Sequence, residues 1–262
     1  MMRLDAYMAA NGLAPSREKA KRLIAEGRVS INGAVVTKAS HSVNEGDTVT
    51  AEQGDGYVGR GAYKLIGALD SFGISLDGKV CADIGASTGG FTQVMLKRGA
   101  EKVFAVDVGH GQLDPLLLND SRVVNCEGVN VRSIQPDFFG GEVSFAACDL
   151  SFISLRTVLP AVFAALSDSA ELVTLIKPQF EAGREAIGKN GLVRSKSDHI
   201  RVLAEMCEFF SAEGVTLLGL IPSPIKGGDG NAEYLAHISK AKSEGCIPDI
   251  GGIVKSALEN RR

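Results

Sequence analysis

From residue 80 onward the chain alternates between short apolar segments and helical ones, and this alternation restricts the possible folds more than any other feature of the sequence. The apolar segments, each about the length of one strand, are Val80–Ile84, Lys102–Val106, Arg122–Cys126, Val143–Asp149 and Leu172–Lys177. The helical patterns between them lie near residues 89–99, 113–119 and 155–167. Strands joined by helices run parallel and are covered on both faces, so the pattern predicts a doubly wound α/β domain.

Two further strand candidates, Val215–Ile221 and Glu233–Ile238, come late in the chain. Too few residues separate them for a helical crossover, which parallel neighbours require. We therefore expect this pair to run antiparallel at one edge of the sheet.

The first fifty residues differ in texture from the rest, because a basic helix is followed there by short β segments. Ser16 is a candidate N-cap of that helix and Gly27 a candidate C-cap. Asn32-Gly33 is typical of a tight hairpin turn. We expect a small domain over residues 1–52, a glycine-rich linker over 53–61, a larger domain over 62–245 and a C-terminal tail or helix over 246–262.

The helix in the small domain is strongly basic. Its positive residues are Arg17, Lys19, Lys21, Arg22 and Arg28, against the acidic Glu18 and Glu26. A charge run alone is more often a solvated helix face, and the net charge of −3 gives the chain no global basic field. The whole pattern, however, resembles the S4-like RNA-binding domain over nearly fifty residues. The resemblance implies that the basic face binds RNA phosphates.

A glycine-rich turn follows the strand at residues 80–84. It reads Asp83-Ile84-Gly85-Ala86-Ser87-Thr88-Gly89-Gly90-Phe91. Such a turn lets the backbone approach a nucleotide-like ligand. Serine stands at position 87, where a dinucleotide fingerprint requires glycine. Asp83 precedes the first glycine by two residues, where it can face the amino-acid end of a ligand.

A second acidic residue, Asp107, ends the next strand about twenty residues after this turn. A carboxylate there can bind the two ribose hydroxyls of either a nicotinamide cofactor or S-adenosylmethionine. Together with Asp83 it favours S-adenosylmethionine. Our candidate cofactor-binding residues are Asp83, Gly85, Ala86, Ser87, Gly89, Gly90, Phe91, Asp107, Asn130 and Asp149.

Four charged residues lie beside apolar segments. Lys64 stands in GAYKL, Asp149 in ACDLSF, Lys177 in LIKPQF and Glu233 in GNAEYL. Ligands of open α/β sheets bind outside the carboxyl ends of the parallel strands, so Asp149 and Lys177 should reach the same crevice as Asp107. A single lysine at a strand end is as often merely exposed, but four such residues in this order favour a catalytic set.

This set resembles the K-D-K-E tetrad of the heat-shock type of ribose 2′-O RNA methyltransferases. Across essentially the whole chain, the sequence is similar to the narrower TlyA family, whose members are also called hemolysins. The strings that carry this similarity are ADIGASTGGFT, AVDVGHGQL, DLSFISL, IKPQFEAGRE, IPSPIKG and GNAEYL. Ser87, Thr88 and Phe91 depart from the heat-shock branch and fit the TlyA branch.

The resemblance implies a class I, Rossmann-like, S-adenosylmethionine-dependent methyltransferase with a mostly parallel seven-stranded sheet and an S4-like domain. The implied substrate is a cytidine ribose 2′-hydroxyl in 16S ribosomal RNA, 23S ribosomal RNA or both, either as free RNA or within ribosomal subunits. Lys177 is the implied general base, which requires that it lose its own proton first. Asp149 and Glu233 are assigned to orientation, and Lys64 to placing the ribose.

Two loop residues, Arg60 and Lys226, are further candidate RNA contacts, with ordinary exposed side chains as the equal alternative. The scattered cysteines and histidines show no metal-ligand spacing, so we expect no metal. The start of the chain lacks the apolar core of a signal peptide, and no apolar run is long enough for a membrane helix. We therefore expect a cytoplasmic enzyme without membrane contact. A membrane-damaging hemolysin and a non-catalytic RNA-binding or ribosome-assembly factor are the alternatives.

Overall fold

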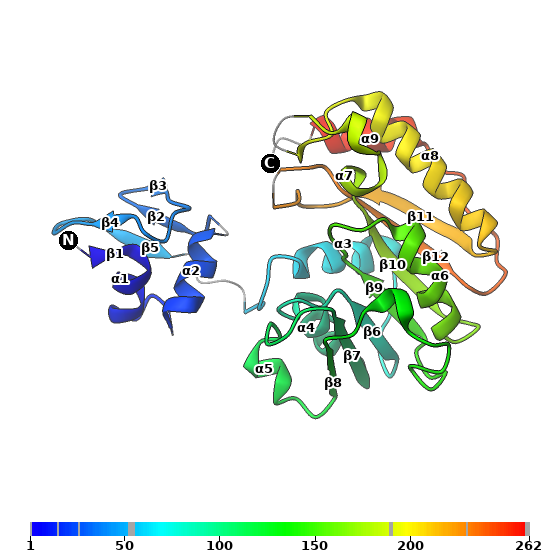
Figure 1. The fold of residues 1–262 in the computed structure, drawn as a ribbon, viewed down its shortest axis with the longest axis horizontal. Coiled ribbons are helices and arrows are strands. Elements are labelled where there is room, and N and C mark those ends of the chain that lie inside the picture. Colours follow the sequence, from blue (N-terminus) through cyan, green and yellow to red (C-terminus); the bar gives the residue numbers. More distant parts are fainter. Residues whose placement is uncertain are drawn as a thin grey trace. The chain divides into compact units, whose positions relative to one another are not determined.

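The computed structural model describes residues 2–14, 16–25, 27–51, 56–188, 191–228 and 230–259, with the backbone alone at Arg22. The chain divides into two compact units, Met1–Gly56 and Tyr57–Arg262 (Figure 1). Of the expected linker, residues 53–55 lie outside the described residues. Residues 57–61 belong to the second unit, where Val58 is 6% exposed and donates its N–H to Gln93 Oε1 at 2.7 Å.

The first unit contains two helices and short strands. The helices are α1 (Leu4–Ala10) and α2 (Arg17–Ala25), and the strands are β1 (Met2–Arg3), β2 (Val29–Ile31), β3 (Ala34–Val35), β4 (Ser42–Val43) and β5 (Val49–Ala51). One sheet has the order β3-β2-β5, and β1 pairs with β4. Asn32 and Gly33 have φ values of 51° and 81° and join the antiparallel strands β2 and β3, which confirms the predicted hairpin turn.

The ends and the packing face of α2 follow from its sequence. Ser16 Oγ accepts a hydrogen bond from the N–H of Lys19 at 3.2 Å, and Gly27 adopts a φ of 70° just after the helix. Both predicted caps are therefore present. Ala20 and Ile24 are fully buried, so the opposite, basic face is left toward solvent.

A seven-stranded sheet forms the middle layer of the second unit. Its strands are β6 (Val80–Ile84), β7 (Lys102–Asp107), β8 (Val123–Glu127), β9 (Phe145–Cys148), β10 (Glu171–Ile176), β11 (Thr216–Pro222) and β12 (Tyr234–Ser239). Their spatial order is β11-β12-β10-β9-β6-β7-β8. The five strands from β6 to β10 run parallel, and β12 runs antiparallel to both β10 and β11. This confirms the expected doubly wound sheet with an antiparallel pair at one edge.

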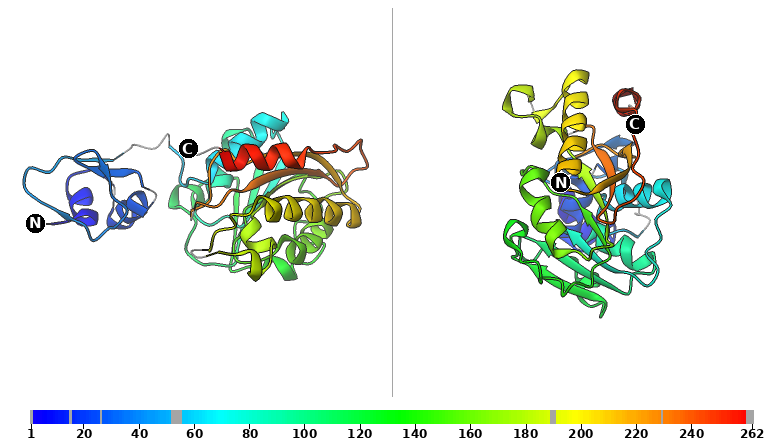
Figure 2. Two further views of the ribbon diagram at one scale, coloured as in Figure 1. Left: turned by 90° about the horizontal axis from the view of Figure 1, so that it is seen from above. Right: turned by 90° about the vertical axis from the view of Figure 1, so that its right-hand side faces the viewer.

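Helices cover both faces of this sheet (Figure 2). They are α3 (Ala62–Phe72), α4 (Gly90–Lys97), α5 (Pro115–Leu118), α6 (Leu155–Ala165), α7 (Pro178–Glu181), α8 (Lys196–Ala212) and α9 (Ile250–Glu259). Apolar residues of α3 and α4 pack on one face, and those of α6, α8 and α9 on the other. Alternate residues of β6 point to the two cores, Cys81 to the first and Ile84 to the second. Burial on both faces explains why the strands read as continuous apolar runs.

The sequence patterns did not single out α3 and α8, and α9 falls in the region expected to be a tail or helix. In the structure α9 is part of the second core, with Val254 fully buried and Ala257 7% exposed.

The strand directions gather the charged residues at the carboxyl ends of the parallel strands. Asp107 ends β7, Asp149 directly follows β9 and Lys177 directly follows β10. Glu233 directly precedes β12. Because Tyr234 pairs with Ile176 in the antiparallel register, Glu233 lies beside the carboxyl end of β10.

Candidate active site

Four charged side chains from four parts of the second unit meet at these strand ends. Lys64 comes from the first turn of α3. Its Nζ lies 2.7 Å from Glu233 Oε2 and 3.2 Å from Asp149 Oδ2. On the other side of Asp149, Oδ1 lies 2.6 Å from Lys177 Nζ. The structure thus joins all four predicted catalytic residues in one chain of ion pairs.

The quartet is largely withdrawn from water. Lys64, Lys177 and Glu233 are 8%, 6% and 4% exposed, and the Asp149 side chain is 18% exposed. Burial alone would lower the pKa of Lys64, but the carboxylates of Asp149 and Glu233 raise it above its ordinary value. Burial likewise opposes ionisation of Asp149, yet the two ammonium groups lower its pKa. Lys64 is therefore held protonated and Asp149 ionised.

The second contact of Lys177 is a hydroxyl. Its Nζ donates to Ser151 Oγ at 2.9 Å, and it lies 5.9 Å from the centre of the Phe180 ring. Ser151 was not among the predicted site residues. Its position two residues after Asp149, on the same strand-end loop, was the available signal.

A cavity of about 540 Å³ opens beside Asp149. Of the ten predicted cofactor-binding residues, Gly85, Ser87, Asp107, Asn130 and Asp149 line it. The other five, Asp83, Ala86, Gly89, Gly90 and Phe91, do not line it. The prediction missed several lining residues, among them Gln112, Arg132 and Phe152. Phe152 is 92% exposed and adopts a φ of 65°, which is unusual for a residue with a bulky side chain.

Asp107 holds the glycine-rich turn in place. Its Oδ2 accepts a hydrogen bond from the N–H of Ser87 at 2.8 Å, and its Oδ1 accepts one from the N–H of Gly109 at 2.8 Å. A carboxylate oxygen can accept more than one hydrogen bond, so Asp107 retains capacity for a ligand hydroxyl. Asn130 similarly uses its side-chain oxygen to accept from the N–H of Arg132, at 3.1 Å.

Asp83 is buried behind the turn, at 1% exposure. Its Oδ2 accepts from the N–H and the hydroxyl of Thr92, at 2.8 and 2.7 Å. Its Oδ1 has no hydrogen-bond partner among the described residues. Burial, together with the charges of Asp149 and Asp107, raises the pKa of Asp83 to about 7. An unpartnered buried carboxylate oxygen suits a cationic group of a ligand.

Gly85 is required by its surroundings. It adopts a φ of 89°, and a Cβ atom there would lie 2.7 Å from the backbone oxygen of Asp149. The first glycine of the turn therefore allows the loops after β6 and β9 to pack closely.

Some of the predicted RNA-binding residues in and after α2 form ion pairs within the first unit. Arg17 lies 3.0 Å from Asp5, whose carboxylate is fully buried, and Lys21 lies 2.6 Å from Glu18. Lys19 and Arg28 are half-buried, and the side chain of Arg22 lies outside the described part. Arg17 thus contributes to the structure of the first unit, which the charge pattern did not reveal.

The two loop candidates lie in the second unit. Arg60 is half-buried in the segment before α3. Lys226 lines a polar cavity of about 230 Å³ together with Glu233 of the quartet and Ala257 of α9. The structure therefore places Lys226, but not Arg60, at a cavity that borders the quartet.

Two other features can be stated for the described residues. No three His, Cys, Asp or Glu side chains are grouped there as a metal site would require. None of the helices described is both long and apolar enough to cross a membrane.

Comparison with protein families gives two matches. Residues 57–240 match the FtsJ-like methyltransferase family, and residues 2–49 match the S4 domain. Hemolysin A of Brachyspira hyodysenteriae is 44% identical over 90% of this chain and 99% of its own length. The 16S/23S rRNA (cytidine-2′-O)-methyltransferase TlyA of Mycobacterium tuberculosis is 44% identical over 88% of this chain and 87% of its own. A solved structure described as a hemolysin from Streptococcus thermophilus has a TM-score of 0.78 and 44% identity, covering 98% of this chain and 95% of that one.

Proposed function

Because this chain belongs to the FtsJ-like methyltransferases and carries an S4 domain, we propose that it methylates the ribose 2′-hydroxyl of cytidine in ribosomal RNA. The observation that carries the proposal is the buried quartet of Lys64, Asp149, Lys177 and Glu233 beside a cofactor-sized cavity. A 44% identical relative is named for this reaction on 16S and 23S rRNA.

The contacts of the two lysines support different roles for them. Lys64 contacts two carboxylates that raise its pKa, so it is a poor proton acceptor and serves as a fixed positive charge. Lys177 contacts one carboxylate and a neutral hydroxyl, and both of these partners, Asp149 and Ser151, line the cavity. We therefore assign Lys177, once it has released its own proton, as the base that takes the proton from the ribose 2′-oxygen.

S-adenosylmethionine is the methyl donor that suits the cavity. A volume of about 540 Å³ lies within the range of small-molecule sites. Asp107 at the cavity wall would hold the ribose hydroxyls. Asp83 does not line the cavity, but the charge of its buried carboxylate, whose Oδ1 has no hydrogen-bond partner among the described residues, would attract the ammonium group from behind the turn. When bound, the cofactor would supply an electrophilic methyl group, whose bond to sulfur breaks so that S-adenosylhomocysteine is the leaving group. The quartet then orients the attacking 2′-oxygen and receives its proton as the new carbon–oxygen bond forms.

The S4 unit would deliver the RNA. Its exposed basic helix face can bind phosphates without reading sequence, and such binding weakens steeply with salt. Lys226, at the small cavity beside Glu233, would contact the acceptor strand. The proposed partners are ribosomal RNA and ribosomal subunits, which places the activity in the cytoplasm.

The test uses tritiated S-adenosylmethionine with ribosomal subunits and naked rRNA from a strain that lacks this protein. We expect label in 2′-O-methylcytidine from the wild type and at least a ~10²-fold lower rate from Lys177→Ala, the loss that removal of a positioned base produces. Lys102→Ala is the matched control, because this lysine pairs with Glu142 at the surface, away from the quartet.

The outcomes separate the competing functions. Label in RNA bases rather than ribose would refute the proposed acceptor atom. S-adenosylmethionine binding without any RNA labelling would favour a binding-only role in ribosome assembly. Lysis of red cells or lipid vesicles by the purified protein, undiminished in Lys177→Ala, would favour a membrane-damaging activity.

A further inference from the structure

Two strand-end loops carry the proposed base and its partners. The loop after β9 carries Asp149 and Ser151, both of which contact Lys177. The loop and short helix after β10 begin with Lys177 itself and end with Glu181. The distances from Lys177 Nζ to its partners therefore depend on how these two segments are held together.

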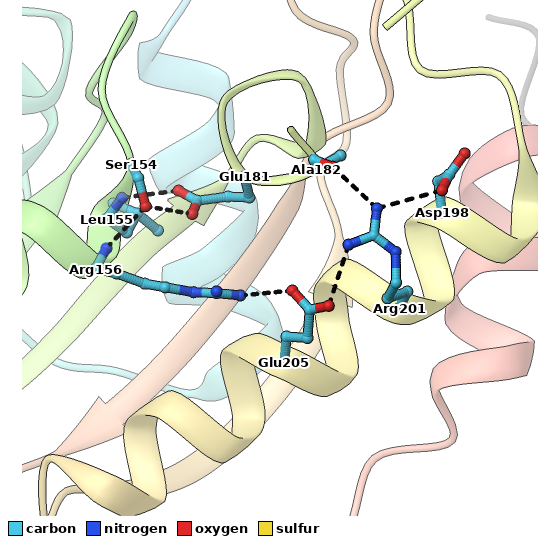
Figure 3. Close-up of polar contacts among 8 residues, drawn as sticks. All are labelled: Ser154, Leu155, Arg156, Glu181, Ala182, Asp198, Arg201 and Glu205. Carbon is cyan, nitrogen blue, oxygen red and sulfur yellow. Dashed lines mark hydrogen bonds and ion pairs between the residues drawn. The ribbon is translucent and has the colours of Figure 1, made fainter. Parts of the chain in front are cut away.

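Glu181 joins the two segments directly (Figure 3). Its Oε2 accepts the hydroxyl proton of Ser154 at 2.7 Å, and its Oε1 accepts the N–H of Leu155 at 2.7 Å. Ser154 is the N-cap of α6 and ends the loop that starts at Asp149. A carboxylate at a helix N-terminus is favoured by both the free N–H groups and the helix dipole.

Burial makes the ionised form of this carboxylate less favourable. Burial raises the pKa of Glu181, while the two hydrogen bonds and the nearby charge of Arg156 oppose that shift. Short hydrogen bonds to an ionised acceptor are about twice as strong as neutral ones. Loss of the side chain would leave the hydroxyl of Ser154 and the N–H of Leu155 without this acceptor.

An outer chain of ion pairs lies beside this contact and, among the described residues, shares no hydrogen bond with the Glu181 carboxylate. Arg156 pairs with Glu205 of α8 at 2.9 Å, and Glu205 pairs with Arg201 at 3.1 Å (Figure 3). Arg201 also donates to the backbone oxygen of Ala182 at 2.9 Å. These charged side chains are about one-third exposed or more, so their pairs contribute little.

A second contact joins the same two segments nearer the site. The rings of Phe152 and Phe180 lie 5.3 Å apart, one residue from Ser151 and three from Lys177. Because Phe152 is almost fully exposed, this ring contact is a weak constraint. Apart from the contacts of Lys177 itself, Glu181 is therefore the stronger of these two links between the segments.

We propose that Glu181 is a positioning residue for the methyl transfer, which clamps the loop of Asp149 and Ser151 to the segment of Lys177. The proposal rests on the proposed function, in which Lys177 is the base. It assigns to a residue that touches neither substrate nor cofactor the task of keeping Lys177 in register with its partners.

The primary test compares Glu181→Ala, Glu181→Gln and Glu205→Ala. A displacement of about 1 Å in a reacting group can cost ~10²-fold in rate, so we expect Glu181→Ala to lower kcat about 10- to 100-fold. We expect the Kd for S-adenosylhomocysteine to change less than about threefold, a limit that separates the loss from a failure of cofactor binding. Glu181→Gln keeps an acceptor for Leu155 and should recover most of the rate. Glu205→Ala disrupts only the outer chain and should match the wild type.

A second readout does not depend on methyl transfer. Brief labelling with acetic anhydride, followed by mass spectrometry, reports the accessibility of each lysine amine. In Glu181→Ala we expect labelling of Lys177 to rise severalfold, while Lys64, held by α3 and two carboxylates, keeps its wild-type rate. A general loosening of the fold would raise both.

The inference is overturned if Glu181→Ala retains the wild-type kcat or if both lysines become equally reactive. Should Glu181→Ala fail to fold, Ser154→Ala removes one of the two hydrogen bonds and carries the same expectations at smaller size. If the wild type methylates no RNA, the proposed function fails, and the labelling of Lys177 still decides the structural part of the inference.

Discussion

Replacement of Lys64 by methionine should lower the free energy of unfolding of the second unit more than the same replacement of Lys177, the other lysine of the quartet. Lys64 is the partner of both Asp149 and Glu233, and Glu233 is 4% exposed. Lys64→Met preserves most of the side-chain volume but leaves the Glu233 carboxylate buried without its cation. Lys177→Met, in contrast, leaves Asp149 paired with Lys64.

The size of the effect follows from the distance and the burial. At 2.7 Å, two unit charges attract by about 6 kcal/mol for an effective dielectric constant of ~20. Desolvation cancels part of this attraction, and removal of one partner from a buried pair typically costs about 3–5 kcal/mol. We expect a loss in that range for Lys64→Met. Lys64→Met combined with Glu233→Gln should recover about 2 kcal/mol or more of it, because no buried charge is then left alone.

The assay is urea denaturation followed by circular dichroism, as a double-mutant cycle over Lys64 and Glu233. Lys102→Met is the control, because its ion pair with Glu142 is 37% and 43% exposed and should contribute under about 1 kcal/mol. Equal losses for Lys64→Met and Lys102→Met, or a coupling energy near zero, would refute the reasoning.

Three further predictions concern other parts of the chain. The pKa of Asp83 is about 7, so its carboxyl is neutral in acid. The Kd for S-adenosylhomocysteine, measured by calorimetry, should therefore rise as the pH falls from about 8 to about 6. Asp83→Asn should remove this pH dependence. Gly85→Ala places a Cβ 2.7 Å from a backbone oxygen of Asp149, so it should abolish cofactor binding, and wild-type affinity in calorimetry would contradict the packing argument. Hydrogen bonding to Arg3 and Arg17 lowers the pKa of Asp5 to about 2. The stabilisation that Asp5 gives the S4 domain is therefore complete above the ordinary pKa of 3.8 and is lost toward pH 2. In a plot of melting temperature against pH, Asp5→Asn should reduce the fall of the melting temperature over this range.

Much of the fold could be predicted from local patterns. The alternation of strands and helices, the caps of α2 and the hairpin at Asn32-Gly33 depend on residues that are close in sequence. The antiparallel edge pair followed from the short connection between Ile221 and Glu233. The helices α3 and α8 were not singled out, although each contributes buried residues to one of the two cores.

The candidate catalytic set was named from four short strings, and the structure brings those residues into contact. Of the ten predicted cofactor-binding residues, only half line the cavity. Asp83 shows the reason: its place before the turn is a sequence feature, but its burial behind Thr92 depends on the packing of α4. Arg17 shows the same limit, since its partner Asp5 lies on another helix.

The sequence by itself determined the fold class and the residue types of the site, because strand periodicity, glycine turns and charges at strand ends are local properties. Only the tertiary structure decided the pairing within the quartet, and with it which lysine is held by two carboxylates and which by one carboxylate and a hydroxyl. The same is true of Glu181, whose partners Ser154 and Leu155 are more than twenty residues away along the chain. Proton affinity and positioning depend on distances between segments, and those distances exist only after the sheet has formed.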